Sequence, residues 1–187
     1  MKRLITIIIV SLLILSCKKE NRTDFVINGT APGVYNGVRV FLKHINERGE
    51  EVITDTAIVF EEKFKITGAV EEPTMRFLSV NGTQGNAMFM LENSEINLEI
   101  NKQNLMESKV TGSKTNEGFV AYQKSINDIR AGGQDAMTAY RSAKLPEDKA
   151  IKDSLKLVLE KVGERIMAQP LNFVKENNDS YFSLNLI

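Results

Sequence analysis

The first half of the chain alternates short apolar runs with turn-forming residues, a pattern typical of β-strands. Val38, Val40 and Leu42 occupy every second position of one run, so that segment has one apolar face. Another run ends at Asn81-Gly82, a strong turn signal. The runs cover residues 25–27, 38–43, 53–60, 64–67, 75–80, 88–91 and 96–100. This spacing predicts a mainly β fold with added α structure: an antiparallel β-sandwich or barrel of about seven or eight strands over residues 24–113.

Helical periodicity replaces the alternation from residue 114 onward. The first apolar side chains at helical spacing are Phe119, Tyr122, Ile126 and Ile129. They predict a helix that Ser113 or Thr115 caps and that Gly132-Gly133 ends.

A second and longer helix is predicted to open with Pro146 in its first turn, where the missing N–H of proline costs nothing. Its apolar stripe consists of Ile151, Leu155, Val158, Val162 and Ile166. Pro170 should break or kink this helix. Another turn or two should follow and end near Asn177-Asn178.

The chain ends in an apolar segment. Asp179 or Ser180 resembles the cap of a last helix over Tyr181–Ile187, which stops almost as soon as it begins. We therefore expect residues 114–187 to form a helical extension that leads to a further domain, with Tyr181–Ile187 exposed or frayed when the chain stands alone.

The first 23 residues have the pattern of an export signal. Lys2 and Arg3 precede an apolar run from Leu4 to Leu15, which is shorter than the roughly 20 apolar residues of a membrane-spanning helix. The run ends at Cys17 in a sequence similar to a lipobox, where bacterial signal peptidase cleaves before a lipidated cysteine. We expect residues 1–16 to be a lipoprotein signal peptide, Cys17 to carry the lipid, and residues 17–23 to form a tether. An ordinary signal peptide with a chance cysteine is the alternative.

Charge and cysteine content narrow the classes of function. The 24 basic residues balance 24 acidic ones, which gives no electrostatic case for binding nucleic acid. Cys17 is the only cysteine, so residues 1–187 contain neither a Cys-x-x-Cys redox pair nor a thiolate zinc site. We expect a protein attached to a membrane of the cell envelope through Cys17, on the periplasmic face of the outer membrane, with surface exposure as a further possibility.

No set of residues predicts catalysis. His44 is the sole histidine and could be a base or a metal ligand, but its setting at a strand end favours a half-exposed strand residue. The paired carboxylates Glu50-Glu51, Glu61-Glu62 and Glu71-Glu72 are interpreted as solvated turn charges, because neighbouring side chains on extended backbone diverge. We therefore predict a protein that is not an enzyme and has no catalytic residue, no cofactor and no metal site.

Two further groups of residues have features of binding motifs. Gly29, Gly33 and Gly37 lack the Gly-Lys-Ser/Thr ending of a phosphate-binding loop and are interpreted as part of a loop. Met75, Met88 and Met90 could suggest a soft-metal or haem site, but apolar strands favour core packing.

The order and spacing of many short motifs resemble DUF4369, a domain at the N-terminus of many Bacteroidota envelope lipoproteins. The matching motifs after Cys17 are Phe25–Gly29, Val40–Leu42, Asp55–Ala57, Phe64–Gly68, Glu71–Pro73, Phe89–Glu92, Ile96–Leu98, Val110–Ser113, Phe173–Asn177 and Asp179–Tyr181. One departure is local, because such domains often carry Asn-Gly-Lys where this chain has Glu61-Glu62-Lys63.

The resemblance implies an association with thiol–disulfide exchange. In the familiar architecture this region precedes a thioredoxin-like domain of the TlpA/ResA kind, which is absent from residues 1–187. The first hypothesis is therefore a non-catalytic accessory or binding domain that partners a thioredoxin-like domain in cis or in trans. The alternative is a stand-alone lipid-anchored binding protein for a small molecule, glycan or peptide, with loops such as 31–37 or 81–87 as its site. An apolar pocket with a few convergent polar groups would favour this alternative.

Overall fold

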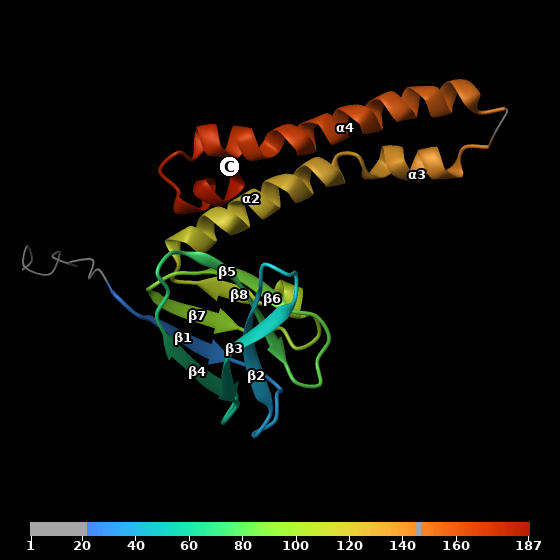
Figure 1. Ribbon diagram of the computed structural model, residues 1–187. Helices are drawn as coiled ribbons and strands as arrows, with labels where there is room; N and C mark the ends of the chain where they lie inside the picture. Colours follow the sequence, from blue (N-terminus) through green and yellow to red (C-terminus); the bar gives the residue numbers. More distant parts are fainter. Residues whose placement is uncertain (1–21, 145–146) are drawn as a thin grey trace, which may run out of the picture.

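The chain folds into a β-sandwich followed by helices that extend away from it (Figure 1). This computed structural model describes residues 22–144 and 147–187, so the predicted signal peptide, Cys17, residues 18–21 of the tether and Pro146 lie outside the described residues. The strands are β1 (Phe25–Thr30), β2 (Arg39–Ile45), β3 (Glu51–Ile58), β4 (Lys63–Gly68), β5 (Thr74–Val80), β6 (Ala87–Leu91), β7 (Glu95–Glu99) and β8 (Lys109–Thr111). They form two sheets, which confirms the predicted sandwich and excludes a closed barrel.

The two sheets each contain four strands, in the orders β4-β1-β7-β8 and β3-β2-β5-β6. Neighbouring strands run antiparallel except β1 and β7, which are parallel, with Ile27 opposite Ile96. The expectation of a wholly antiparallel sandwich is corrected at this pair. No hairpin connects β1 to β7, so no tight turn imposes opposite directions on them.

Alternate residues of the strands fill the space between the sheets. Ile27, Val40, Leu78 and Phe89 are completely buried. Gly29 leaves room for the ring of Phe64 on the neighbouring strand, since a Cβ at Gly29 would lie 2.0 Å from that ring. The core thus closes between the sheets, while β6 and β8 remain as the last strands of their sheets.

The β3–β4 turn adopts an unusual backbone conformation for its residues. Glu61 has φ 48° and Glu62 has φ 57°, the left-handed region that favours glycine or asparagine. The turn is attached to the neighbouring loop: the Glu61 N–H donates to Asn36 Oδ1 at 2.8 Å, and the Gly33 N–H donates to the Glu62 carboxylate at 2.7 Å. These contacts hold a conformation that the residue types disfavour.

Replacing Glu61 by asparagine should therefore stabilise the protein. The left-handed conformation costs about 1–2 kcal/mol for most L-residues and less for asparagine, so we expect the free energy of unfolding to rise by about 1 kcal/mol. Urea denaturation measures the change. Glu71→Asn, at an exposed acidic residue without positive φ, is the matched control and should leave the midpoint unchanged. An equal effect of both substitutions would contradict the role of the turn.

The first predicted helix is confirmed as α2 (Lys114–Ala131), which ends at Gly132 as expected. The structure adds a helix that the sequence did not predict, α3 (Gln134–Ser142), and the 3-10 helix η2 (Leu105–Glu107). Helix α3 has only nine residues and none of them is buried, so its few apolar side chains mark no core-facing stripe.

Of the two predicted effects of Pro170, a break of the long helix is wrong, whereas a kink stays a prediction. Helix α4 (Lys149–Glu176) continues through Pro170. Packing on both sides of the proline holds the helix together: Gln169 donates to the Ser125 hydroxyl of α2 at 2.9 Å, and Phe173 is buried against α2. Tertiary contacts here outweigh the local cost of the missing N–H.

The expectation of an exposed C-terminal segment is also corrected. Ser180 caps the 3-10 helix η3 (Tyr181–Leu186), and Phe182 and Ser183 of this helix are buried. Phe182 packs with Phe119, Tyr122 and Phe173 at ring-centroid distances of 5.5, 5.7 and 6.0 Å. Only the outer residues stay open, with Ile187 90% exposed. The segment packs against α2 and α4 because the ring of Phe182 completes an aromatic cluster with side chains of these helices.

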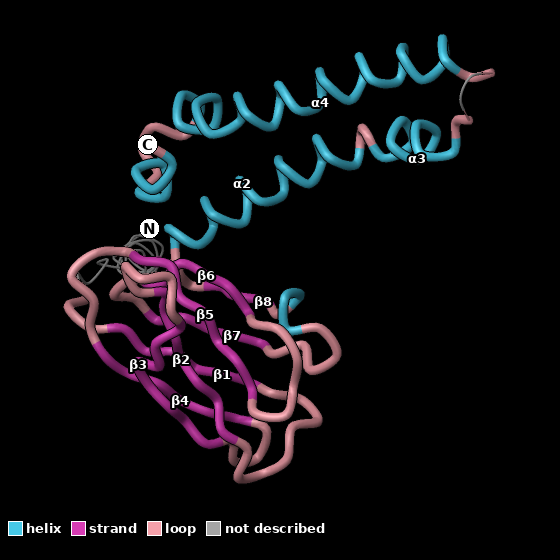
Figure 2. Tube along the Cα trace, turned by 45° about the vertical axis from the view of Figure 1, so that its right-hand side comes forward, coloured by secondary structure: helices cyan, strands magenta, loops and turns pink. Residues whose placement is uncertain are grey.

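Beyond this aromatic cluster, α3 and the first half of α4 form an arm of two helices that projects away from the sandwich (Figures 1 and 2). Phe173 is the only buried residue of α4, and Ile151 and Val158 of the predicted apolar stripe are exposed. The stripe packs in part against α2 and α3 and makes no packing layer on the sheets.

Candidate functional site

A buried hydrogen-bond network fixes the angle between the sandwich and α2. The Met90 N–H of β6 donates to Asn116 Oδ1 at 3.0 Å, and Asn116 Nδ2 donates to the Val110 carbonyl of β8 at 3.4 Å. The Ser113 hydroxyl donates to the Met90 carbonyl at 3.3 Å and accepts from the Asn116 N–H at 3.0 Å. Asn116 therefore bridges the last strands of both sheets, and Ser113 caps α2 as the sequence predicted.

Gly112 makes this close approach possible. Its φ is +90°, and a Cβ there would lie 2.1 Å from the backbone oxygen of Glu95. Since a backbone atom cannot move aside as a flexible side chain can, only glycine fits at the point where the chain leaves β8 for the helix.

The angle between α2 and the sandwich contains a groove of about 490 Å³, which we call the elbow groove. From the sandwich it is lined by Asn86, Met88, Met106, Glu107, Ser108 and Val110. From α2 it is lined by Asn116, Phe119, Val120, Gln123, Asn127 and Arg130. The short helix η2 lies near β6 and β8 (Figure 2), and its Met106 lines the groove.

The apolar floor of the elbow groove is open to solvent. Met88 is 42% exposed, Met106 77% and Val120 53%. Three exposed apolar side chains in one concavity differ from scattered single ones, which need no explanation. Methionine side chains are flexible and polarisable, and they adapt to apolar partners of varied shape.

The α2 wall of the elbow groove is polar. Gln123, Asn127 and Arg130 follow Asn116 and Val120 at alternating spacings of four and three residues, which places all five on one face of the helix. The adjoining face of α2, with Phe119 and Tyr122, packs against Phe173 of α4 and Phe182 of η3, and Phe119 also borders the groove. The side-chain amides of Gln123 and Asn127 therefore lie beside the exposed apolar side chains of the groove.

One strand edge opens into the elbow groove. Antiparallel pairs alternate between residues that exchange backbone hydrogen bonds and residues that do not. Met90 bonds Asn116 and Ser113 on its outer side, so it does not exchange backbone bonds with Met75 of β5. Met88, two residues away, has the same orientation and directs its N–H and C=O away from β5, toward the edge of β6 that pairs with no other strand of the described residues.

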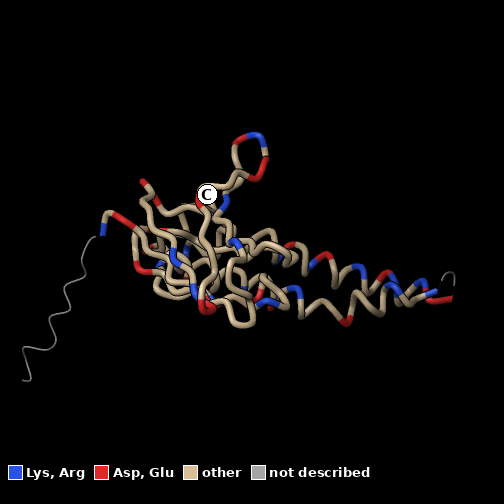
Figure 3. The backbone as a smooth tube through the Cα atoms, turned by 90° about the horizontal axis from the view of Figure 1, so that it is seen from below, with Lys and Arg blue, Asp and Glu red and all other residues tan. Residues whose placement is uncertain are grey.

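The elbow groove is nearly neutral. Arg130 is its only basic residue and Glu107 its only acid, and it contains no histidine or cysteine. Basic and acidic residues also interleave along the helices (Figure 3). This set of groups can bind apolar side chains and backbone amides, but it offers no acid–base pair for catalysis.

A second hollow, of about 670 Å³, lies over the outer face of the sheet that contains β1. Lys63, Lys65 and Lys109 surround it, with Glu99 as the acid among the lining residues. Its floor side chains, such as Asn28 and Asn97, are those of an ordinary solvated sheet face. None of its lining residues is an exposed large apolar one, so the elbow groove is the better candidate.

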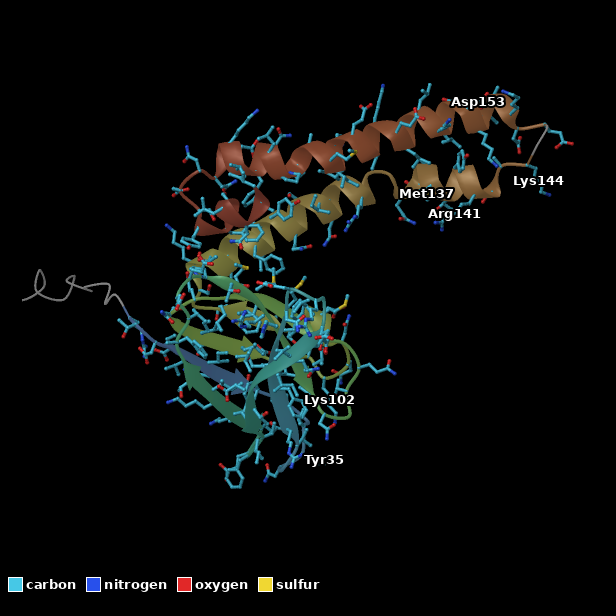
Figure 4. All side chains as sticks on the ribbon, in the orientation of Figure 1. Tyr35, Lys102, Met137, Arg141, Lys144 and Asp153 are labelled. Atoms are coloured by element: carbon cyan, nitrogen blue, oxygen red, sulfur yellow. The ribbon has the colours of Figure 1, made fainter. Side chains whose placement is uncertain are left out.

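Loop 31–37, one of the loops named as a possible site, lies at the end of the sandwich away from the arm, where Tyr35 and Lys102 appear in Figure 4. Tyr35 is exposed, and the Lys102 ammonium lies 5.2 Å from its ring centroid and donates to the Gly33 carbonyl at 2.6 Å. Pro32 of this loop lines a hollow of about 330 Å³ whose other lining residues are mostly polar. Loop 81–87 contributes only Asn86 to the elbow groove.

Two charged groups outside the elbow groove have shifted pKa values. Burial lowers the pKa of the Arg76 guanidinium, which donates to the Thr74 hydroxyl and the Met75 carbonyl. A hydrogen bond from Lys149 to Asp153, at 2.6 Å near the tip of the arm (Figure 4), raises the pKa of the lysine. Both shifts have local structural causes and assemble no reactive group.

The candidates from sequence are not brought together. His44 is half-buried in β2, and its Nδ1 has no hydrogen-bond partner among the described residues. The three glutamate pairs are exposed as predicted. Among the described residues, no three His, Cys, Asp or Glu side chains gather into a possible metal site.

The prediction for the methionines holds in part. Met90 is completely buried and Met75 is half-buried beside it. Met88 was expected in the core, and that is wrong: β6 is the last strand of its sheet, so the outer face at Met88 opens into the elbow groove. Sequence analysis also missed Met106, which stands in a polar stretch without periodicity.

Comparison with known proteins gives a single family. Residues 25–119, just over half of the chain, match the family described as Domain of unknown function (DUF4369). The match runs from β1 into α2 and so includes the joint at Asn116 and most of the residues of the elbow groove. No curated protein matches the chain. No helix within 22–144 or 147–187 has the length and apolar character to cross a membrane.

Proposed function

Because this chain belongs to the DUF4369 family, we propose that it is a non-catalytic binding module of a lipid-anchored envelope protein, which holds an apolar segment of a partner protein in the elbow groove. The observation that carries the proposal is the gathering of exposed Met88, Met106 and Val120 in one concavity. Concave apolar sites with a few polar groups are the usual form of binding sites.

The stiffness of the joint supports a binding role. Since Asn116 connects β6, β8 and α2, the two walls of the groove are held at one angle before a partner arrives. A preformed site loses less conformational entropy on binding than one that must be assembled. The fold thus supplies a rigid receptor instead of a mobile loop.

We place this module in the cell envelope of a member of the Bacteroidota, bound to the periplasmic face of the outer membrane. The export pattern of residues 1–16 and the lipobox-like sequence before Cys17 support this location. A lipid on Cys17 and the short polar tether would keep the sandwich close to the membrane surface.

Substitution of Cys17 by serine should abolish the lipid. In cells fed a radiolabelled or alkyne-tagged fatty acid, we expect label on the natural protein and a loss of at least tenfold in the Cys17→Ser variant. The variant should also accumulate as the longer precursor. Equal labelling of both proteins would contradict lipidation at Cys17, and an ordinary export signal would then explain residues 1–16.

The partner favoured by the family resemblance is a thioredoxin-like domain, in cis or in trans, that carries out thiol–disulfide exchange. The alternative is a stand-alone protein that binds a small molecule, glycan or peptide. The apolar elbow groove is the kind of site that a stand-alone binding protein requires.

Photo-crosslinking in the producing bacterium tests the groove. A photoreactive amino acid at Val120 should give a discrete adduct, and Met106→Glu should reduce its yield at least fivefold because a carboxylate replaces an apolar contact. Met167→Glu is the matched control, since Met167 is 83% exposed on α4 and does not line the groove. Mass spectrometry of the adduct then identifies the partner and tests whether it is thioredoxin-like.

The same reactive group at Leu171, an exposed residue of α4, shows the background. No adduct at Val120, or the same adducts at Val120 and Leu171, would contradict the proposed function. Circular dichroism confirms that Met106→Glu is folded, so that a reduced yield reports on the groove.

A further inference from the structure

We propose that the occupant of the elbow groove is an extended peptide that adds a strand to the free edge of β6 at Met88. This inference rests on the proposed function and specifies the partner's chemistry. Its basis is the free backbone edge of β6 combined with the apolar floor and the amide wall described above. Addition of a strand to an exposed sheet edge is a common way to bind a peptide.

The edge offers a limited number of backbone bonds. Asn116 and Ser113 occupy the outward N–H and C=O of Met90, so a peptide cannot pair there. The next outward pair along β6 belongs to Met88. Pairing with an added strand would therefore stop before Met90 and would begin at Met88.

The α2 wall of the groove has the length of a short peptide. Asn116 and Arg130 lie fourteen residues apart on α2, which corresponds to about 21 Å along the helix axis. An extended chain of about six residues has this length.

The two walls predict an alternating sequence. The side chain of Met88 lies on the outer face of β6, so every second residue of an added strand shares its face and meets the apolar floor. Gln123 and Asn127 can bond polar side chains or the unpaired backbone of the peptide. The groove therefore favours a peptide of alternating apolar and hydroxyl-bearing residues.

Charge selects the ends of this peptide. Arg130 is the one cation of the groove and complements an acidic residue, whereas the centre is uncharged and disfavours charged side chains there. A second copy of this chain is a different occupant, and analytical ultracentrifugation distinguishes it: a dimer that peptide does not dissociate would overturn the proposal.

The probe is a fluorescein-labelled heptapeptide, Glu-Val-Thr-Val-Thr-Val-Thr, added to the full-length lipidated protein in detergent micelles. We expect saturable binding by fluorescence anisotropy. A peptide of the same composition with its valines grouped together should bind at least tenfold more weakly. Met106→Glu should weaken binding at least tenfold, and Met167→Glu should leave it within twofold.

Backbone methylation tests the strand itself. N-methylation of the valines removes donors that face β6 in an antiparallel strand, and N-methylation of the threonines does so in a parallel one. We expect one set to weaken binding at least tenfold and the other to change it less than threefold. Hydrogen exchange of a fragment containing Met88 should also slow at least fivefold in the presence of the peptide.

The possible failures are distinguishable. Binding that Met106→Glu abolishes but neither methylated set weakens would overturn strand addition and leave the groove as a binding site. No saturable binding of the heptapeptide, together with an adduct at Val120 in cells, would overturn the alternating peptide and retain the proposed function. Loss of both results would overturn both.

Discussion

Replacing Asn116 by alanine is expected to lower the free energy of unfolding by about 2–4 kcal/mol. The substitution leaves the buried Met90 N–H without its acceptor and the Val110 carbonyl without the Asn116 donor. A buried backbone group without a partner costs about 1–3 kcal/mol. Urea denaturation, followed by circular dichroism, measures this loss.

Two matched variants separate the network from the helix. Asn116→Asp retains an acceptor for the Met90 N–H but loses the donor to Val110, so its stability should lie between those of the natural protein and Asn116→Ala. Gln123→Ala, on the groove side of the same helix, should change stability by less than about 0.5 kcal/mol. Equal stability of Asn116→Ala and Gln123→Ala would show that the joint is not held by Asn116.

The joint also connects stability to binding. If the Asn116 network fixes the angle between β6 and α2, small-angle scattering of folded Asn116→Ala should reveal a wider range of arm orientations. The heptapeptide should then bind more weakly, because each binding event must first restore the angle. The stability and the affinity therefore report on the same two hydrogen bonds of the Asn116 side chain, to the Met90 N–H and the Val110 carbonyl.

The strands of the sandwich could be predicted because the residues that indicate each strand and turn are neighbours in the sequence. Alternation such as Val38, Val40, Leu42 records which face of a strand is buried, and Asn81-Gly82 records a turn. The parallel pairing of β1 with β7 could not be predicted, since it depends on how segments far apart in sequence meet. Pro170 shows the same limit, because packing of Gln169 and Phe173 outweighs a strong local signal.

The elbow groove escaped prediction for a related reason. Met88 and Met90 belong to one apolar run, yet the capping of the β6 edge by α2 makes Met90 core and leaves Met88 as groove. Met106 has no periodic neighbours that could mark it. A site between two structural layers is encoded in their relative placement, and one sequence without its fold does not display that placement.

The second large effect is expected from Phe182→Ala, which should lower the free energy of unfolding by about 3–5 kcal/mol. The ring of Phe182 is 3% exposed and meets three other aromatic rings from α2 and α4. Removing it leaves a cavity in the cluster that also contains Met90 of β6. Thermal unfolding followed by circular dichroism measures the loss.

Leu184→Ala is the matched control, because Leu184 belongs to the same 3-10 helix and is exposed. It should change stability by less than about 0.5 kcal/mol. Phe182→Leu should recover part of the loss, since leucine fills much of the space without the ring contacts. An unchanged melting temperature for Phe182→Ala would contradict the docked C-terminal segment. A loss of stability in Phe182→Ala but not in Leu184→Ala would show that η3 completes the aromatic cluster that holds α2 and α4 together.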